Sequence, residues 1–298
     1  MIQADNVTMV FEEKYALKQM SCTIPDGCIY GLVGSNGAGK STFLRLLSGV
    51  YKPASGTILF DGQPVFDNTT VKEHLVYVPD DLYFLPQATM HKMAKLYAAV
   101  YPSFSFPRFW ELTEIFGLNP RANISSFSKG MKRQAATILA LAVCPKYLFF
   151  DETFDGLDPV IRNLVKTVLY NDVAERNSTV IITSHSLREL EDTCDQLALL
   201  HKGGVVFESD IQNLKTSLFK VQVGLSVPFD QSAFSEISML NYMQKGSVAS
   251  FIVRGEREAT VEKLQTMSPV LLDILPLSLE EVFIHEMDAL GYAFKDIL

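Results

Sequence analysis

Residues 28–41 read CIYGLVGSNGAGKS, and this stretch decides how the rest of the chain is interpreted. Residues 28–33 form a short apolar run typical of a buried strand, and residues 34–41 form a glycine-rich loop. The residues that follow, TFLRLLSGV, have the apolar spacing of a helix. Residues 34–41 fit the pattern G-x-x-x-x-G-K-[ST], which binds phosphates when it stands between a strand and a helix.

The residue types of this loop suit a phosphate chain. Gly37 and Gly39 let the backbone curl so that successive N–H groups face the phosphates. Lys40 reaches the β- and γ-phosphates, Ser41 offers a hydroxyl to Mg²⁺, and the helix that begins here adds its positive end. The residues expected to contact the nucleotide in this stretch are Gly34, Ser35, Asn36, Gly37, Ala38, Gly39, Lys40, Ser41 and Thr42.

A second buried strand, YLFFDE at residues 147–152, ends in two acids. A phosphate site needs an acid at such a position, because the cation that accompanies the phosphates must be held. We expect Asp151 to hold Mg²⁺ and Glu152 to polarise the attacking water as a general base.

Composition limits the class of protein. A length of 298 residues suits one large domain and one small one, and a net charge of −8 argues against a general nucleic-acid binder. The longest apolar run, residues 138–144, is far below the roughly 20 residues of a membrane span, and residues 1–14 lack a secretion signal. The cysteines show no metal-binding spacing and are expected to be reduced; they are Cys22, Cys28, Cys144 and Cys194.

The order of elements predicts an α/β fold. Strands are expected within residues 53–65, 74–79, 146–152 and 178–183, and helices at 159–177 and 186–200. Alternating strands and helices imply a parallel sheet covered on both faces. A mostly helical insertion is expected over about residues 82–144, and the pattern changes to a small α+β domain at residues 214–298, whose last helix is expected at 279–290.

Five motifs in sequence order resemble the ATP-binding cassette (ABC) family, the ATPase subunits of ABC transporters, over about residues 1–215. Residues 34–42, GSNGAGKST, look like the Walker A loop, and residues 147–152 look like Walker B with the catalytic glutamate. FSKGM at residues 127–131 stands where the family has its signature, usually LSGGQ. DGLDP at residues 155–159 is similar to the D-loop, and TSH at residues 183–185 carries the switch histidine.

The resemblance implies a fold with a mixed-sheet core, a helical subdomain at about residues 82–144, and a cassette domain at residues 1–213. It implies ATP and Mg²⁺ as ligands and a head-to-tail dimer, identical or mixed, that encloses two ATP molecules. Lys40 and Glu152 would be catalytic, with His185 touching the γ-phosphate and orienting Glu152. The residues expected to reach the ATP of a facing subunit are Ser128, Lys129, Gly130 and Asp158. Ser128 would also cap its helix.

Three positions depart from the family pattern or leave a choice open. Lys129 and Met131 replace a glycine and a glutamine of the signature. Asp80 stands where the family usually has the Q-loop glutamine, and its carboxylate could hold Mg²⁺; Gln87 is a weaker alternative. Spacing favours Phe11 as the aromatic that stacks on adenine, with Tyr15 as the runner-up.

The function expected from these motifs is an ATP-binding and ATP-hydrolysing subunit that powers a separate transmembrane permease, in export. LEEVF at residues 279–283 is similar to the end of the extension that bacterial export-type cassettes often carry. The expected location is the cytoplasm, at the inner face of the membrane through the permease. The alternatives are a soluble ABC ATPase that acts outside transport and an ATP-binding regulatory module.

Overall fold

The computed structural model describes residues 1–154 and 156–289, so residues 290–298, with the end of the last expected helix, and Asp155 of the expected D-loop lie outside it. The contacts divide the chain into unit 1, Met1–Glu208, and unit 2, which begins at Ser209. The sequence places the boundary slightly later, after residue 213.

The central sheet of unit 1 has the strand order β10-β9-β3-β8-β7-β6. Its strands are β3 (Ile29–Val33), β6 (Leu75–Val78), β7 (Tyr147–Asp151), β8 (Thr179–Ser184), β9 (Gln196–His201) and β10 (Gly204–Asp210). Strands β9, β3, β8, β7 and β6 pair in parallel, and every residue of β3, β7 and β8 is buried. This is the expected sheet of an α/β fold, and it brings the carboxyl ends of β3, β6, β7 and β8 to one edge.

The helices of this part are α1 (Lys40–Leu47), α6 (Pro159–Arg176) and α7 (Leu187–Glu191). The expected helix at residues 186–200 is wrong beyond Glu191, because residues 196–201 form strand β9 beside β3. Leu197–Leu200 is a continuous buried run, and such a run suits a strand in the middle of a parallel sheet as well as a buried helix. Pairing with β3 makes this segment a strand.

A second sheet, which sequence reasoning left partly unassigned, has the order β2-β1-β4-β5 and is antiparallel. Its strands are β1 (Ile2–Phe11), β2 (Lys14–Ile24), β4 (Ser55–Phe60) and β5 (Gln63–Pro64), and helix α2 (Thr69–Lys72) follows. The expected turn at Asp61 and Gly62 joins β4 to β5. Strands β1 and β2 were not predicted.

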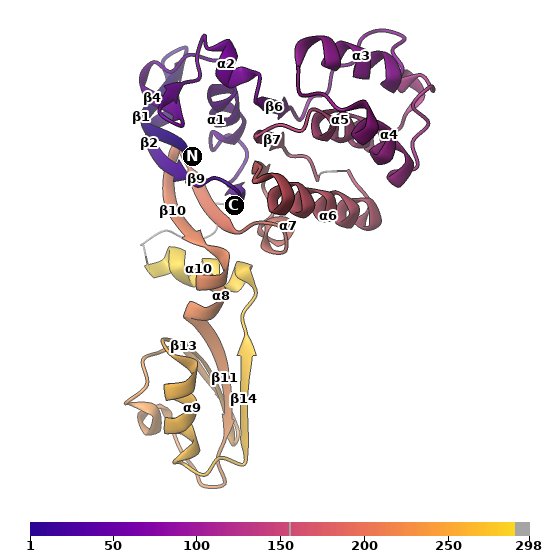
Figure 1. The fold of residues 1–298 in the computed structure, drawn as a ribbon. Helices are drawn as coiled ribbons and strands as arrows, with labels where there is room; N and C mark the ends of the chain where they lie inside the picture. The colour runs from indigo at the N-terminus through magenta and orange to yellow at the C-terminus, as the bar shows by residue number, and fades with distance from the viewer. Residues whose placement is uncertain (155, 290–298) are drawn as a thin grey trace. The chain divides into compact units, whose positions relative to one another are not determined.

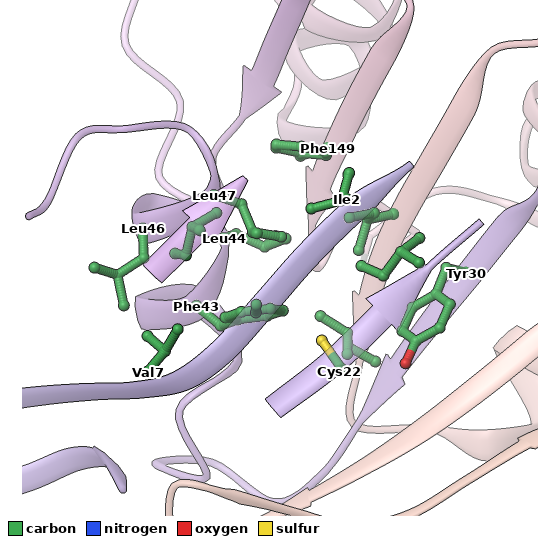
Figure 2. Packing of buried hydrophobic residues seen from close by; sticks show 14 of the residues in the cluster. Ile2, Val7, Cys22, Tyr30, Phe43, Leu44, Leu46, Leu47 and Phe149 are labelled. Carbon is green, nitrogen blue, oxygen red and sulfur yellow. The ribbon is translucent and has the colours of Figure 1, made fainter. Parts of the chain in front are cut away.

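The core of this part lies between the antiparallel sheet, helix α1 and one face of the parallel sheet. Figure 2 shows Phe43, Leu44 and Leu47 of α1 among Ile2 of β1 and Phe149 of β7. Each of these side chains is fully buried, which contributes about 1.5–3 kcal/mol per residue. The apolar face of α1 therefore anchors the helix whose first turn follows the glycine-rich loop.

The mostly helical insertion contains α3 (Met90–Val100), α4 (Phe106–Ile115), a 3₁₀ turn at Ile124–Ser126 and α5 (Lys129–Ala142). Side chains of Thr89, Ser105 and Ser128 cap the three helices. Helix α5 packs against α3, α4 and β6, and all its residues from Arg133 to Ala142 are buried. Figure 1 shows these helices as a group beside β6 and β7.

Unit 2 is a four-stranded antiparallel sheet with the order β12-β13-β11-β14 and helices around it. Its elements are α8 (Ile211–Ser217), β11 (Leu218–Gly224), a 3₁₀ turn (Gln231–Phe234), β12 (Met239–Lys245), β13 (Val248–Arg254), α9 (Arg257–Gln265), β14 (Leu271–Pro276) and α10 (Leu279–Ala289). Its core includes Phe219, Val221, Phe234, Phe251 and Leu264. Strand β12 was not predicted. Across both units, no helix of the described ranges is long and apolar enough to cross a membrane.

Candidate functional site

The glycine-rich loop joins β3 to α1, as the sequence predicts. Gly39 is the N-cap of α1 with φ of 110°, and a Cβ there would lie 2.7 Å from Ala16 O and from the Leu17 side chain. Only glycine fits this position without strain. Within the described residues no side chain caps α1, and its first turn holds no acid, so its N–H groups suit an anion.

Lys40 is buried beneath this loop. Its Nζ donates to Gly34 O at 2.6 Å and to Ser35 O at 3.3 Å, and it lies 3.4 Å from Glu152 Oε1. The loop thus holds the positively charged Lys40 ammonium, and its backbone hydrogen-bond partners, two carbonyl groups, are neutral. Among the other expected contacts, Asn36 and Gly37 are exposed, Ala38 is buried, and Thr42 lies in the first turn of α1.

Asp151 is buried at the end of β7 and accepts three hydrogen bonds. Ser41 Oγ donates at 3.0 Å, Thr183 Oγ1 at 2.8 Å and the Tyr77 hydroxyl at 3.1 Å. Burial, and then the charge of Asp151, raises the pKa of Tyr77 to about 12, so this hydroxyl keeps its proton. Sequence reasoning assigned no role to Tyr77 or Thr183; pairing of β6 and β8 with β7 brings both to Asp151.

The oxygens of Ser41 and Asp151 are of the type that Mg²⁺ prefers. In the described part of the chain, no group of three or more His, Cys, Asp or Glu side chains could hold a metal ion. A cation at this place would therefore need further oxygens from phosphates or water. Ser41 and Asp151 therefore suit a Mg²⁺ ion that enters the site together with the nucleotide.

Glu152 follows β7 and lies between two basic side chains. Its Oε2 is 3.0 Å from His185 Nδ1, and its Oε1 is the atom near Lys40. Its backbone has φ of 49°, a conformation that residues with side chains rarely adopt, and its N–H donates to Thr183 Oγ1 at 3.0 Å. The His185 side chain is 58% exposed, so the group opens toward solvent.

The expected signature residues lie at the start of α5. Ser128 Oγ accepts a hydrogen bond from the Met131 N–H at 3.2 Å, as an N-cap does. A Cβ on Gly130 would lie 3.1 Å from Gly156 O, and one on Gly156 would lie 3.8 Å from Lys129 Cδ. The start of α5 therefore lies beside the loop that follows Glu152.

Asp158 closes that loop by capping α6. Its Oδ1 accepts from the N–H groups of Val160 and Ile161, each at 3.0 Å. The residues expected to act on a facing subunit's ATP thus belong to two neighbouring helix starts of one chain. Their action across a dimer remains a prediction.

Asp80 follows β6 and pairs with Arg133 of α5, with Oδ1 2.5 Å from Nη2. Sequence reasoning did not anticipate this ion pair, because Arg133 belongs to no motif. Binding of Mg²⁺ by Asp80 stays a prediction. The alternative residue, Gln87, is exposed.

Both candidates for adenine stacking are exposed aromatics of the β1–β2 hairpin. Phe11 is 41% exposed and meets the ring of Tyr51 edge to face at 5.5 Å, whereas Tyr15 is 61% exposed. An exposed aromatic ring suits base stacking. Phe11 remains the preferred residue.

A phosphate loop, a buried acid on the next strand but one and a glutamate held by histidine define a P-loop nucleoside triphosphatase. Comparisons with known proteins identify the family. The family described as "ABC transporter" matches residues 17–155. The ABC transporter ATP-binding protein YtrB of Bacillus subtilis is 30% identical over 285 residues, which cover 95% of this chain and 97% of that protein.

A further relative and two solved structures are also similar to this chain. The bacitracin transport ATP-binding protein BcrA of Bacillus licheniformis is 31% identical, with 72% of this chain and 71% of that protein covered. A solved ATP-binding subunit of an ABC transporter has a TM-score of 0.67 at 24% identity and covers 72% of this chain and 92% of its own. A dimeric cassette solved with ADP and Pi has a TM-score of 0.64 at 23% identity, covering 71% and 99%.

The chain belongs to the ABC transporter family and is one of its ATP-binding, ATP-hydrolysing subunits.

Proposed function

We propose that this chain hydrolyses ATP with Glu152 as general base, and that Mg²⁺ accompanies the nucleotide. Lys40 and the N–H groups at the start of α1 hold the β- and γ-phosphates. Ser41 and Asp151 hold Mg²⁺, which when bound supplies positive charge to the phosphate oxygens. Glu152 takes a proton from water as it attacks, and His185 orients the Glu152 carboxylate.

The observation that carries this proposal is the placement of Glu152. One of its oxygens is 3.4 Å from Lys40 and the other 3.0 Å from His185, while Asp151 beside it bonds Ser41. A base, a phosphate-binding cation and a metal-binding pair are therefore within one connected group. Proximity of this kind supplies much of the rate in phosphoryl transfer.

We propose further that the site is completed by a facing subunit, whose Ser128, Lys129, Gly130 and Asp158 reach the γ-phosphate. The N-terminus of α5 suits an anion, and its cap leaves the helix end open at the surface. The dimeric cassette solved with ADP and Pi supports a dimer as the working form. The facing subunit is a second copy or a different cassette.

The transport role is proposed from relatives. One relative is named for bacitracin transport and another for linearmycin resistance, which favours export through a separate permease at the inner face of the membrane. A net charge of −8 favours a partner other than nucleic acid. Fractionation of cells is the test. Recovery with membranes is expected, whereas recovery with ribosomes or DNA would favour a soluble ABC ATPase outside transport.

The test of the catalytic proposal is Glu152→Gln, which keeps size and removes the base. We expect the affinity for Mg·ATP to be retained and turnover to fall by about 100-fold or more. Glu114→Gln, an exposed glutamate of α4, is the matched control and should keep its turnover. Undiminished turnover in Glu152→Gln would remove the general-base role from Glu152.

A further inference from the structure

Beside strand β4 lies an apolar hollow of about 340 Å³ that shares no residue with the nucleotide site. The end of α1, the segment before β4, β4 itself and the residues at the end of β5 enclose it. Leu46, Ile58 and Val65 form its inner wall, and each is no more than 5% exposed. Figure 2 shows the Leu46 side chain on the other side of α1 from Leu44, so α1 presents a second apolar face to this hollow.

Phe66 lines the same hollow and is 39% exposed. Its ring stands partly in water beside buried aliphatic side chains, so a ligand that covers the ring removes apolar surface from water. Covering such surface is favourable in proportion to its area. The hollow therefore suits a ligand with an apolar body.

Two ammonium groups stand near the Phe66 ring. Nζ of Lys52, which also lines the hollow, is 5.8 Å from the ring centroid, and Nζ of Lys72 is 6.0 Å from it. Both distances are at the outer limit of a cation–π contact, so the ring compensates the two charges only weakly. Two like charges therefore make this side of the hollow positive.

No carboxylate of the described residues neutralises these two lysines. Asp67 and Glu73 stand nearby in the sequence, but in the described ranges neither forms an ion pair with them. Lys72 Nζ donates to the carbonyl of Gly49 at 3.0 Å, which is a neutral partner. In a chain with a net charge of −8, two lysines without a carboxylate beside an apolar hollow are complementary to an anion from outside the chain.

We propose that this hollow binds a small organic anion with an apolar body, such as a medium-chain carboxylate. The charged group of the ligand faces Lys52 and Lys72, and its chain covers Phe66 and the wall formed by Leu46 and Val65. At about 30 Å³ for each water-sized group, the hollow holds roughly ten non-hydrogen atoms. The site is separate from ATP binding and does not depend on the proposed catalytic mechanism.

The source of this ligand is a free small molecule and not a membrane lipid. Space for roughly ten atoms is too small for the acyl chains of a bilayer lipid. A net charge of −8 also repels the anionic surface of a membrane.

Octanoate, a carboxylate of about this size, is the probe, and isothermal titration of the full chain measures its affinity. We expect a dissociation constant of about 0.1–1 mM, as befits so small a ligand. Acetate carries the charge without the apolar body, and 1-octanol carries the body without the charge. Each should bind at least about tenfold more weakly. Equal affinities for octanol and octanoate would show that the lysines contribute nothing, and would overturn the proposal.

Three variants separate the charge from the hollow. Lys52→Gln should raise the dissociation constant of octanoate about tenfold, and Lys52→Arg should retain the parent value. Ala54→Phe, at an exposed position that lines the hollow, should fill it and abolish binding while both lysines remain. The ATP affinity of each variant should stay within about twofold of the parent value, which shows that the fold is intact.

Lys95→Gln is the matched control, because it removes an exposed lysine of α3 and changes the net charge equally. It should bind octanoate as the parent does. An equal loss in Lys52→Gln and Lys95→Gln would mean that overall charge alone governs binding, and the site would be refuted.

Two further measurements place the ligand. Methyl NMR resonances of Leu46, Ile58 and Val65 should shift with octanoate, and binding without these shifts would rule out this hollow. Saturating Mg·ATP should leave the affinity for octanoate unchanged, whereas displacement would put octanoate at the phosphate loop and overturn the proposal. Lys52-dependent binding to phosphatidylglycerol vesicles would make the source a membrane lipid and contradict a free ligand.

Discussion

The role of Lys40 can be predicted from its motif, and the structure adds how the side chain is held. The motif places it on a phosphate chain, and the fold adds that it is buried and already bonded to two carbonyl groups of its loop. Its ammonium is therefore held in position before the phosphates arrive. Such preorganisation lowers the entropy cost of binding.

Lys40→Ala should lower the affinity for ATP by about 100-fold or more, because two charge-assisted hydrogen bonds to phosphate are lost. Isothermal titration with Mg·ATP measures this. Lys92→Ala, which removes an exposed lysine of α3, is the control and should bind as the parent does. An unchanged affinity in Lys40→Ala would refute the phosphate site.

Thr183 carries a contact that its sequence position does not reveal. Its hydroxyl donates to Asp151 and accepts the N–H of Glu152, so Thr183→Val removes one of three hydrogen bonds to Asp151 and leaves the Glu152 N–H without this acceptor. We expect the free energy of unfolding to fall by about 1–3 kcal/mol and turnover to fall with it. Urea unfolding and ATPase rates provide the measurements.

Thr137 offers a matched control for that substitution. It is fully buried in α5, and its hydroxyl has no hydrogen-bond partner among the residues that the structure describes. Thr137→Val should be neutral or stabilising, since no bond is lost. A similar loss in both variants would mean that shape, and not hydrogen bonding, dominates at Thr183.

At the same scale, sequence predicts some of the site and not the rest. Lys40, Ser41, Asp151, Glu152 and His185 stand in short motifs, and the fold brings them into one connected group. Single hydroxyl and charged residues carry no such signal. The contacts of Tyr77, Thr183 and Arg133 depend on which strands and helices become neighbours, and one sequence does not state that.

At the scale of elements, prediction worked where local pattern and tertiary pairing agree. The strand at residues 147–151 and helix α6 are long or uniformly apolar and were placed correctly. The apolar run of β9 fits the periods of both a helix and a strand, so the sequence predicts a helix where pairing with β3 makes a strand. The sequence does not predict strands β1 and β2, because irregular pairing interrupts their alternation between buried and exposed residues.

The start of α10 gives a prediction that depends on pH. Glu281 Oε2 accepts from the N–H of Ser278 at 2.9 Å and from its hydroxyl at 3.0 Å, and Ser278 Oγ accepts from the Glu281 N–H. This is a capping box. The backbone hydrogen bond from Ser278 is the main cause that lowers the pKa of Glu281, so the folded form stabilises the carboxylate.

Because the folded pKa of Glu281 lies below its unfolded value, its contribution is present above the unfolded pKa and is lost as pH falls through the folded one. Glu281→Ala should therefore destabilise α10 by about 1 kcal/mol at pH 7, and the difference should shrink in acid. Hydrogen exchange of the α10 amides, compared with the parent at each pH, tests this. Glu258→Ala, in the first turn of α9, should show little effect.

At the scale of the whole molecule, the two units differ in how much sequence explains. Unit 1 follows from ordered motifs, whereas unit 2 was placed only by strand pattern and carries no chemical motif. YtrB matches 95% of the chain and so includes unit 2, but the linearmycin resistance protein LnrL matches only 69%. Unit 2 is thus shared with some relatives, and its role is a separate question from ATP hydrolysis.

Dimer formation is the prediction that joins residue chemistry to the whole molecule. A single chain has a mass of 33.3 kDa, and Glu152→Gln should become a particle of about twice that mass only with Mg·ATP, because turnover no longer reopens it. Light scattering measures the mass. Adding Ser128→Arg should block the dimer while each chain still binds ATP, since a bulky side chain would occupy the start of α5. A dimer that forms despite Ser128→Arg would remove the trans role. A chain that binds ATP and stays at 33.3 kDa would point to a different cassette as the facing subunit, or to a signature too altered to close.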